Sequence, residues 1–178
     1  VDERVLIPRP ETELLIEEAI ARLQGRGEAT VCEIGTGSGC IAVSLAAELP
    51  QIKVVATDIS KDALAVAKMN CETYGVTSRV QLIESDLLTD AGLAAEHFDA
   101  IVANLPYIGK SECHLVSKEA LDHEPPTALF GGETGTELIE RLLAQIAVLA
   151  KKPEFVLLEC GFLQREKVTA LASAHLPG

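Results

Sequence analysis

The sequence has no tryptophan, and aromatic residues make up only 3% of it, so a hydrophobic core must be built from aliphatic side chains. No apolar run approaches the roughly 20 residues that a membrane-spanning helix needs, and no secretory signal pattern stands at the start. Hydrophobic residues still account for 48% of the 178 positions. We therefore expect one globular domain, residues 1–178, in the cytoplasm and without a membrane partner.

Paired cysteine and histidine motifs are also missing. Five cysteines and four histidines are scattered through the chain, with no C-x-x-C and no H-x-x-x-H spacing. An odd number of cysteines in apolar or helical surroundings is typical of a reducing compartment. The spacing gives no reason to expect a metal site.

Positive charge is scarce as well. The chain has 15 Lys and Arg against 27 Asp and Glu, a formal net charge of −12, and no basic cluster. Such a field repels a phosphate backbone, so the composition disfavours nucleic acid as a partner.

Short apolar runs alternate with helical patterns along the whole chain. The expected strands are 30–35, 53–60, 79–86, 98–106 and 154–161, and the expected helices are 10–23, 40–50, 61–75, 136–150 and 164–176. The strands are almost continuously apolar, as in a parallel sheet covered on both faces. The pattern predicts an α/β fold with a doubly wound, mostly parallel sheet and helices on both faces. Residues 1–28 form a leading segment and helix, and 109–135 form a partly ordered active-site loop.

Glycine and acidic residues gather where the expected strands end, which is where ligands bind in such sheets. The stretch "EIGTGSGC" (33–40) has a glycine at every second position, and Asp58 follows at the end of the next strand, about 20 residues later, the distance at which such folds place an acid on a ribose. The dinucleotide pattern G-x-G-x-x-G does not fit, since Cys40 or Ala42 would have to be glycine. An ordinary strand–helix turn, and Asp58 as a helix N-cap, are the alternatives.

The pattern E-x-G-x-G-x-G resembles motif I of the class I S-adenosylmethionine-dependent methyltransferases. The resemblance implies S-adenosylmethionine as cofactor. Its methionine part would lie on Gly35, Thr36, Gly37, Ser38 and Gly39. Asp58 would bind the ribose hydroxyls, Asp86 and Leu87 would flank the adenine, and Asn104 would lie beside the cofactor.

A further motif, "NLPY" (104–107), ends the fourth expected strand and resembles the [N/D]-P-P-[Y/F/W] motif of amino-group methyltransferases. These enzymes methylate a planar nitrogen whose lone pair is delocalised. The side-chain oxygen of Asn104 and the carbonyl of Leu105 would accept its two hydrogens. Pro106 restricts Leu105 to extended conformations, and Tyr107 would stack on the substrate.

Three more stretches resemble the HemK/PrmC family, the N5-glutamine methyltransferases of peptide-chain release factors. They are "VLIPRPETELL" (5–15), "EPPTALFGGETG" (124–135) and "VLLECGFLQ" (156–164). The resemblance implies methyl transfer to the glutamine of a G-G-Q tripeptide, with a release factor as protein partner.

The sequence departs from that family at several points. Leu105 stands where the family has proline, a form seen in rRNA adenine dimethyltransferases. We expect the upstream helical substrate-recruiting domain and a C-terminal β-hairpin to be missing. The alternatives are a nucleic-acid adenine or cytosine amino-methyltransferase, and a non-catalytic fragment that only binds the cofactor. An NAD-dependent oxidoreductase is a more distant fourth reading, since no hydride-transfer acid is evident.

Overall fold

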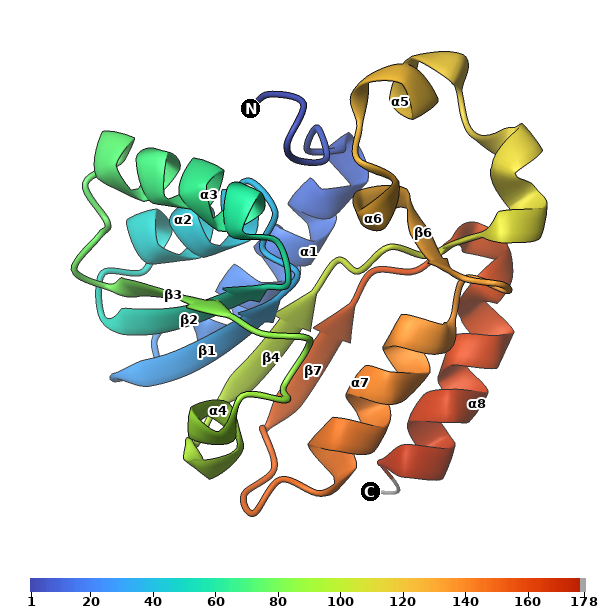
Figure 1. The fold of residues 1–178 in the computed structure, drawn as a ribbon. Coiled ribbons are helices and arrows are strands. Elements are labelled where there is room, and N and C mark those ends of the chain that lie inside the picture. The colour runs from blue at the N-terminus through green and yellow to red at the C-terminus, as the bar shows by residue number, and fades with distance from the viewer. Residues whose placement is uncertain (177–178) are drawn as a thin grey trace.

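The computed structural model describes residues 1–176. Five strands form one sheet in the order β3-β2-β1-β4-β7, and every neighbouring pair is parallel (Figure 1). They are Ala29–Ile34 (β1), Ile52–Asp58 (β2), Val80–Glu84 (β3), Ala100–Ala103 (β4) and Phe155–Leu158 (β7). All five lie inside the ranges predicted from the sequence or within one residue of them.

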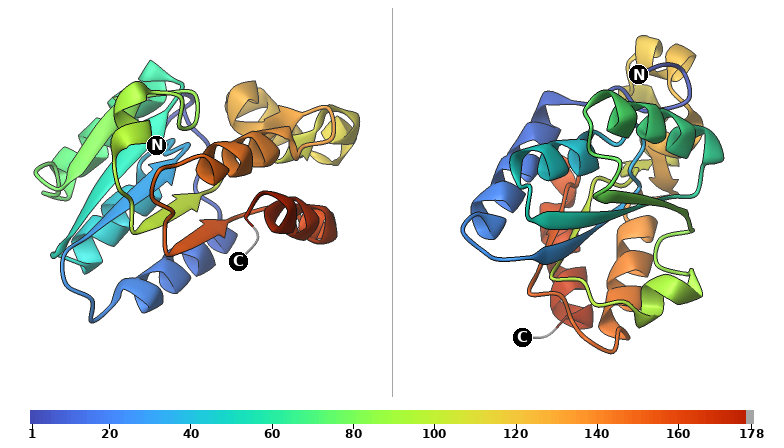
Figure 2. Two further views of the ribbon diagram at one scale, coloured as in Figure 1. Left: turned by 90° about the horizontal axis from the view of Figure 1, so that it is seen from below. Right: turned by 90° about the vertical axis from the view of Figure 1, so that its left-hand side faces the viewer.

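Helices cover both faces of this sheet (Figures 1 and 2). One face packs against Pro10–Leu23 (α1), Cys40–Glu48 (α2) and Lys61–Thr73 (α3). The other packs against Ala91–Ala95 (α4) and Glu137–Ala147 (α7), and Arg165–His175 (α8) lies beside α7. The predicted doubly wound α/β fold is therefore confirmed.

The three central strands, β1, β2 and β4, are mostly buried because their side chains alternate between two apolar clusters. In β1, Val31 belongs to the cluster under α1–α3, and Cys32 belongs to the cluster under α4 and α7. Within the described residues, Phe98 is the one aromatic side chain of the core, at 1% exposure. The prediction of an aliphatic core is thus confirmed.

The helix starts follow from local sequence. Pro10 occupies the first turn of α1, where its missing N–H costs nothing, and Glu11 and Glu13 face the positive end of the helix dipole. The N-cap of α3 is Ser60, whose hydroxyl accepts a hydrogen bond from the Ala63 N–H at 3.2 Å.

The segment 109–135 is more regular than the sequence suggested. It contains a 3-10 helix (Lys110–Leu115), two short helices, Lys118–His123 (α5) and Pro126–Leu129 (α6), and the strand Phe130–Gly132 (β6). Strand β6 pairs in parallel with Ile108–Gly109 (β5) in a separate two-stranded ladder. A second 3-10 helix, Phe162–Gln164, follows β7.

Strand β7 is the outermost strand at one edge of the sheet, and β3 is the outermost at the other. Beyond β7, Phe162 and Leu163 are 94% and 83% exposed.

Among residues 1–176, none of the helices has both the length and the apolar character to cross a membrane.

Candidate active site

The chemically distinctive residues meet at the carboxyl edge of the sheet. Ile34 is in register with Thr57 of β2 and with Ala103 of β4, and Ala103 is in register with Leu158 of β7. Asp58, the last residue of β2, is in register with Glu84, the last residue of β3. The residues at or just beyond these strand ends therefore lie along one edge. They are Gly35, Asp58, Asp86, Asn104 and Glu159.

The glycine loop turns sharply between β1 and α2. Gly35, Gly37 and Gly39 all have positive φ, of 75°, 54° and 80°, which side chains rarely adopt. A Cβ on Gly35 would lie 3.0 Å from Leu105 Cδ2, so this loop and the N-L-P-Y loop are in close contact. Gly39 has a different role: a Cβ there would lie 3.1 Å from Ala67 Cβ, so Gly39 lets α3 approach, and it is not among the residues that line the pocket.

Asp58 ties the glycine loop to the second strand. Its Oδ2 accepts a hydrogen bond from Gly37 N at 2.8 Å, and its Oδ1 accepts one from Ser60 N at 2.9 Å. The N-cap of α3 is Ser60, so the alternative of Asp58 as the helix cap is wrong. A carboxylate has about four acceptor positions, and Asp58 lines the pocket with capacity for two further donors.

Asp86 and Leu87 form the next part of the wall. The Asp86 Oδ2 accepts a hydrogen bond from the Arg141 guanidinium of α7 at 2.6 Å. Leu87 is buried and has a φ of 56°, and within residues 1–176 no other non-glycine residue has a positive φ. Such backbone strain persists only where the surroundings fix it, and it concentrates at ligand sites.

Glu33 is a buried carboxyl group on the same wall. Its Oε2 accepts hydrogen bonds from Thr36 Oγ1 at 2.7 Å and from Ala42 N at 3.0 Å. Its Oε1 is buried without a hydrogen-bond partner. Burial raises the pKa of Glu33 to about 8. A buried acceptor without a partner fits a ligand that brings a cationic or donor group to this wall.

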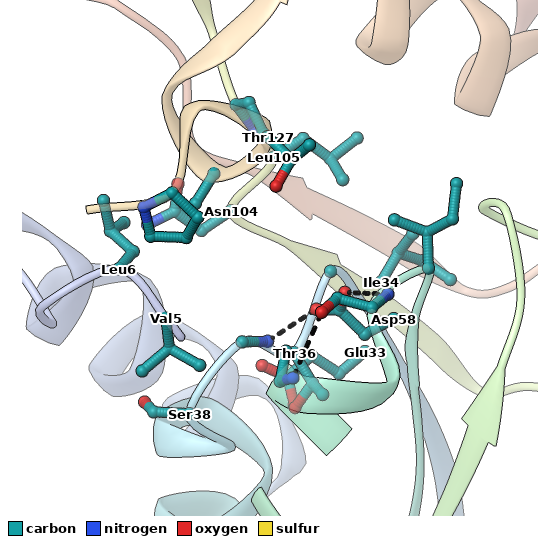
Figure 3. Close-up of a pocket in the computed structure, with 18 of the residues that line it drawn as sticks. Val5, Leu6, Glu33, Ile34, Thr36, Ser38, Asp58, Asn104, Leu105 and Thr127 are labelled. Atoms are coloured by element: carbon teal, nitrogen blue, oxygen red, sulfur yellow. Dashed lines mark hydrogen bonds between the residues drawn. The ribbon is translucent and has the colours of Figure 1, made fainter. Parts of the chain in front are cut away.

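These residues enclose a pocket of about 330 Å³, which is the size of a small-molecule site. In Figure 3, Asn104, Leu105 and Thr127 lie on one side and Asp58, Thr36 and Ser38 on the other. It is also lined by Leu6 and Pro8 of the leading segment and by Pro125 and Ala128, at and within the start of α6. We call these two stretches the roof of the pocket.

An ion pair between a partly exposed arginine and a buried carboxylate joins the two stretches of this roof. The Glu124 side chain is 1% exposed and accepts hydrogen bonds from Arg9 Nη2 at 2.7 Å and from Ile7 N at 3.3 Å. It joins the leading segment to the loop before α6. The sequence offered these two stretches only as family resemblances, and the structure brings them together.

Asn104 lies on the pocket wall and is held from behind. Its Nδ2 donates a hydrogen bond to Thr12 Oγ1 at 2.9 Å. Thr12 Oγ1 in turn donates to Glu159 Oε2 at 3.0 Å. The nitrogen end of the amide is therefore occupied, and Asn104 Oδ1 stays available as an acceptor. Leu105 and Pro106 line the pocket next to it.

Tyr107 is placed differently from the rest of its motif. It is not among the residues that line the pocket, and its hydroxyl donates to Glu159 Oε1 at 3.3 Å. The aromatic residue on the pocket wall is Phe130 of β6. Sequence reasoning missed Thr12 and Phe130. Thr12 sits in the first turn of a helix, and its 3% exposure was the property that the sequence did not reveal.

Comparison with known proteins explains this combination of features. Residues 10–159 match the family model described as methyltransferase small domain. The chain belongs to that methyltransferase family. The release factor glutamine methyltransferase of Rhodopirellula baltica is 48% identical over 148 residues, which cover 80% of this chain and 49% of that protein. The protein of the same name from Koribacter versatilis is 43% identical over 162 residues, 91% of this chain and 57% of that protein.

The match to solved structures concerns the methyltransferase fold. Ribosomal protein L11 methylase from Lactobacillus delbrueckii superposes with a TM-score of 0.68 at 22% identity, covering 96% of this chain and 71% of that one. The chain spans about half the length of the curated relatives it matches. The predicted resemblance to the release-factor methyltransferases is confirmed at the level of family and fold.

The buried Glu33 makes the folded methyltransferase domain sensitive to pH. In the unfolded chain a glutamate ionises near pH 4.3, whereas burial raises the pKa of Glu33 to about 8. The contribution of Glu33 to stability is therefore complete below the unfolded pKa and is lost as pH rises to about 8. We expect Glu33→Gln to flatten the fall in the free energy of unfolding between pH 5 and 8, measured by urea denaturation.

The exposed Glu28 gives the matched control, since Glu28→Gln removes one carboxylate from the surface. Its stability profile should parallel that of the parent. Parallel profiles for Glu33→Gln and the parent would contradict the account of a protonated Glu33.

Proposed function

We propose that this chain is the catalytic domain of a protein-(glutamine-N5) methyltransferase. It would transfer a methyl group from S-adenosylmethionine to the side-chain amide nitrogen of the glutamine in the G-G-Q motif of a peptide-chain release factor. The observation that carries the proposal is the orientation of Asn104, whose amide nitrogen is bonded to Thr12 and whose oxygen is left free beside the glycine loop. The names of the curated relatives support the same substrate.

The pocket fits the proposed cofactor. Gly35, Thr36, Gly37 and Ser38 would surround its methionine part. The positively charged ammonium group of the cofactor would favour the ionised form of Glu33, whose Oε1 could then accept a hydrogen bond from it. Asp58 would accept hydrogen bonds from the two ribose hydroxyls, and Asp86 and Leu87 would flank the adenine. Gly39 supports this arrangement only indirectly, through the packing of α3.

S-adenosylmethionine supplies, when bound, a methyl group on a sulfonium, which needs no activation by the protein. The chain's own task is to place the acceptor nitrogen. Asn104 Oδ1 and the carbonyl of Leu105 would each accept one hydrogen of the glutamine NH₂, which directs the nitrogen lone pair at the methyl group. Correct placement supplies most of the rate gain in such a reaction. No strong base is needed, since the nitrogen becomes acidic once it is alkylated.

Glutamine suits this site better than a nucleobase. No Lys or Arg lies between Phe98 and Gly109, and the net charge of −12 opposes a phosphate backbone. The stacking role predicted for Tyr107 remains a prediction; Phe130 is an aromatic residue that already lines the pocket. A release factor acts on the ribosome, so the proposed activity belongs in the cytoplasm.

The direct test offers tritiated S-adenosylmethionine with three acceptors side by side: a release factor, a G-G-Q peptide, and RNA. Label on the release factor or the peptide, and none on a G-G-A peptide, is expected. Label on RNA alone would replace the proposal by the nucleic-acid alternative. Tight cofactor binding without transfer to any acceptor would favour the non-catalytic alternative.

Asp58→Ala is expected to weaken binding of S-adenosylhomocysteine by about 1.5–3 kcal/mol, the range for hydrogen bonds to a charged group. The variant loses the acceptor for the ribose and also the bond that holds Gly37 N. Isothermal titration calorimetry measures the change. Asp62→Ala, an exposed carboxylate in the first turn of α3, is the matched control and should bind like the parent. Equal affinities for all three proteins would remove Asp58 from the cofactor site.

A further inference from the structure

A chain of hydrogen bonds runs from the pocket wall to the end of β7. Asn104 Nδ2 donates to Thr12 Oγ1 at 2.9 Å, and Thr12 Oγ1 donates to Glu159 Oε2 at 3.0 Å. Thr12 is 3% exposed, so solvent does not compete for its hydroxyl. The three residues are 92 and 147 positions apart in sequence and come from α1, the end of β4 and the end of β7.

The direction of this chain follows from a count of hydrogens. A threonine hydroxyl has one hydrogen to donate. An ionised carboxylate only accepts, so the Thr12 hydrogen must point at Glu159. The hydroxyl oxygen can then only accept from Asn104, and the NH₂ end of the amide must face Thr12. Turning the amide over would place two acceptors against each other in a buried site.

We propose that Glu159 and Thr12 are positioning residues that set which end of the Asn104 amide faces the methyl acceptor. This inference rests on the proposed function, in which Asn104 Oδ1 accepts a hydrogen from the glutamine amide. Neither residue touches the acceptor in this account. Both act through Asn104.

The second carboxylate oxygen of Glu159 contacts Tyr107, the last residue of the N-L-P-Y motif. Tyr107 OH donates to Glu159 Oε1 at 3.3 Å. The carbonyl of Tyr107 accepts from Gln164 Nε2 at 2.7 Å, and Gln164 Oε1 accepts from Gly161 N at 3.0 Å. The segment that follows β7 therefore binds Tyr107 of the N-L-P-Y loop both at its side-chain hydroxyl and at its backbone carbonyl.

This arrangement depends on the charge of Glu159. When Glu159 is protonated it can donate to Thr12, and the Thr12 hydroxyl is then free to donate to a reversed Asn104 amide. Burial raises the pKa of Glu159, and the charge of Glu11 acts in the same direction. The titratable groups that face this carboxylate are Glu11 at the start of α1, Cys40 on α2, Tyr107, and Cys160 on its own segment. Arg9, just before α1, acts on the neighbouring Tyr107. The rate should therefore be high above the Glu159 pKa and fall as pH drops through it.

Three substitutions separate positioning from simple structural support. Thr12→Val keeps the shape of the side chain and removes the hydroxyl. We expect kcat to fall roughly 10–100-fold, the size of loss found when the hydrogen-bond partner that orients a metal ligand is removed. KM and affinity for S-adenosylhomocysteine should change little. Thr12→Ser should restore most of kcat. The glutamine in Glu159→Gln has no ionisable group, so the fall in kcat at low pH that we assign to Glu159 should be absent in this variant. Thr169→Val, at an exposed position of α8, is the matched control for the threonine change.

A second measurement reads the amide itself and needs no substrate. The chain contains two asparagines, Asn70 and Asn104, so asparagine-selective ¹⁵N labelling gives two side-chain NH₂ groups in the NMR spectrum. Asn104→Asp assigns them. The Asn104 signals should shift with pH in the parent, stop titrating with Glu159 in Glu159→Gln, and move in Thr12→Val. Asn70, whose Nδ2 donates to Ser38 O at 2.8 Å, is the internal reference and should stay unchanged.

The outcomes separate the positioning role of Thr12 and Glu159 from the proposed methyltransferase activity. If the parent methylates a G-G-Q substrate and all the variants match it in kcat and pH profile, the positioning role is overturned and the proposed function stands. If the parent methylates nothing, the proposed function fails, and the NMR signals still decide the orientation. Asn104 signals that do not respond to Thr12→Val or to Glu159→Gln would overturn the inference in either case.

Discussion

Asn104→Ala is expected to slow methyl transfer to a G-G-Q substrate by roughly 10²–10³-fold, the usual effect of removing one preorganised polar contact from a closed site. The change removes the acceptor that would bind one hydrogen of the glutamine NH₂. It also leaves Thr12 Oγ1 without its donor. Affinity for S-adenosylhomocysteine should change much less, since the glycine loop and Asp58 are untouched. Single-turnover kinetics with tritiated cofactor measure the rate, and calorimetry measures the affinity.

Gln81→Ala provides the control for this experiment, because Gln81 is an exposed amide on β3, away from the pocket. It should match the parent in both measurements. A loss in Asn104→Ala that appeared entirely in cofactor affinity would speak against its role at the acceptor nitrogen.

Gly131→Ala is expected to disrupt the active site, although Gly131 is not among the residues that line the pocket. A Cβ at Gly131 would overlap the carbonyl oxygen of Pro106 and lie 2.8 Å from the Gly135 carbonyl oxygen, so the backbone has to move. Overpacking of this kind costs typically about 1–3 kcal/mol of stability. Because Pro106 belongs to the N-L-P-Y loop, displacing it by even ~1 Å should cost about 10²-fold in rate. Urea denaturation and the methyl-transfer assay give the two values.

The comparison is Gly27→Ala, where the new Cβ would meet nothing within 4 Å and the backbone has no positive φ. Stability and rate should both stay at the parent values there. A Gly131→Ala protein that kept full activity would mean that β6 does not hold the N-L-P-Y loop in place.

The sheet could be predicted because each strand has a short apolar run, and each of the long helices has apolar residues at the helical period. The segment 109–135 could not, since its helices are only four to six residues long and its strand "FGG" has two glycines. A single turn of helix shows no periodicity. The conformation of the segment 109–135 depends on contacts with other parts of the chain, such as the contact of Gly131 with Pro106.

The candidate site divides in the same way. The positions after the strand ends were predictable, because parallel strands bring their carboxyl ends to one edge. The direction of individual side chains was not. Strand β4 ends at Ala103, so strand alternation does not extend to Tyr107, and nothing in the sequence indicated that Tyr107 turns toward Glu159. Leu105 was expected to act through its backbone alone, and its side chain is buried against the glycine loop.

The ion pair between Arg9 and Glu124 also bears on the order in which the molecule assembles. It joins positions 115 apart, so the loop between them must be closed before the contact can form. Contacts of this separation form late in folding, after the local βα units. We therefore expect the roof of the pocket to assemble after the local βα units, and to be able to open locally while the sheet stays intact. Amide hydrogen exchange at Ile7, whose N–H is bonded to Glu124, would report that opening separately from global unfolding.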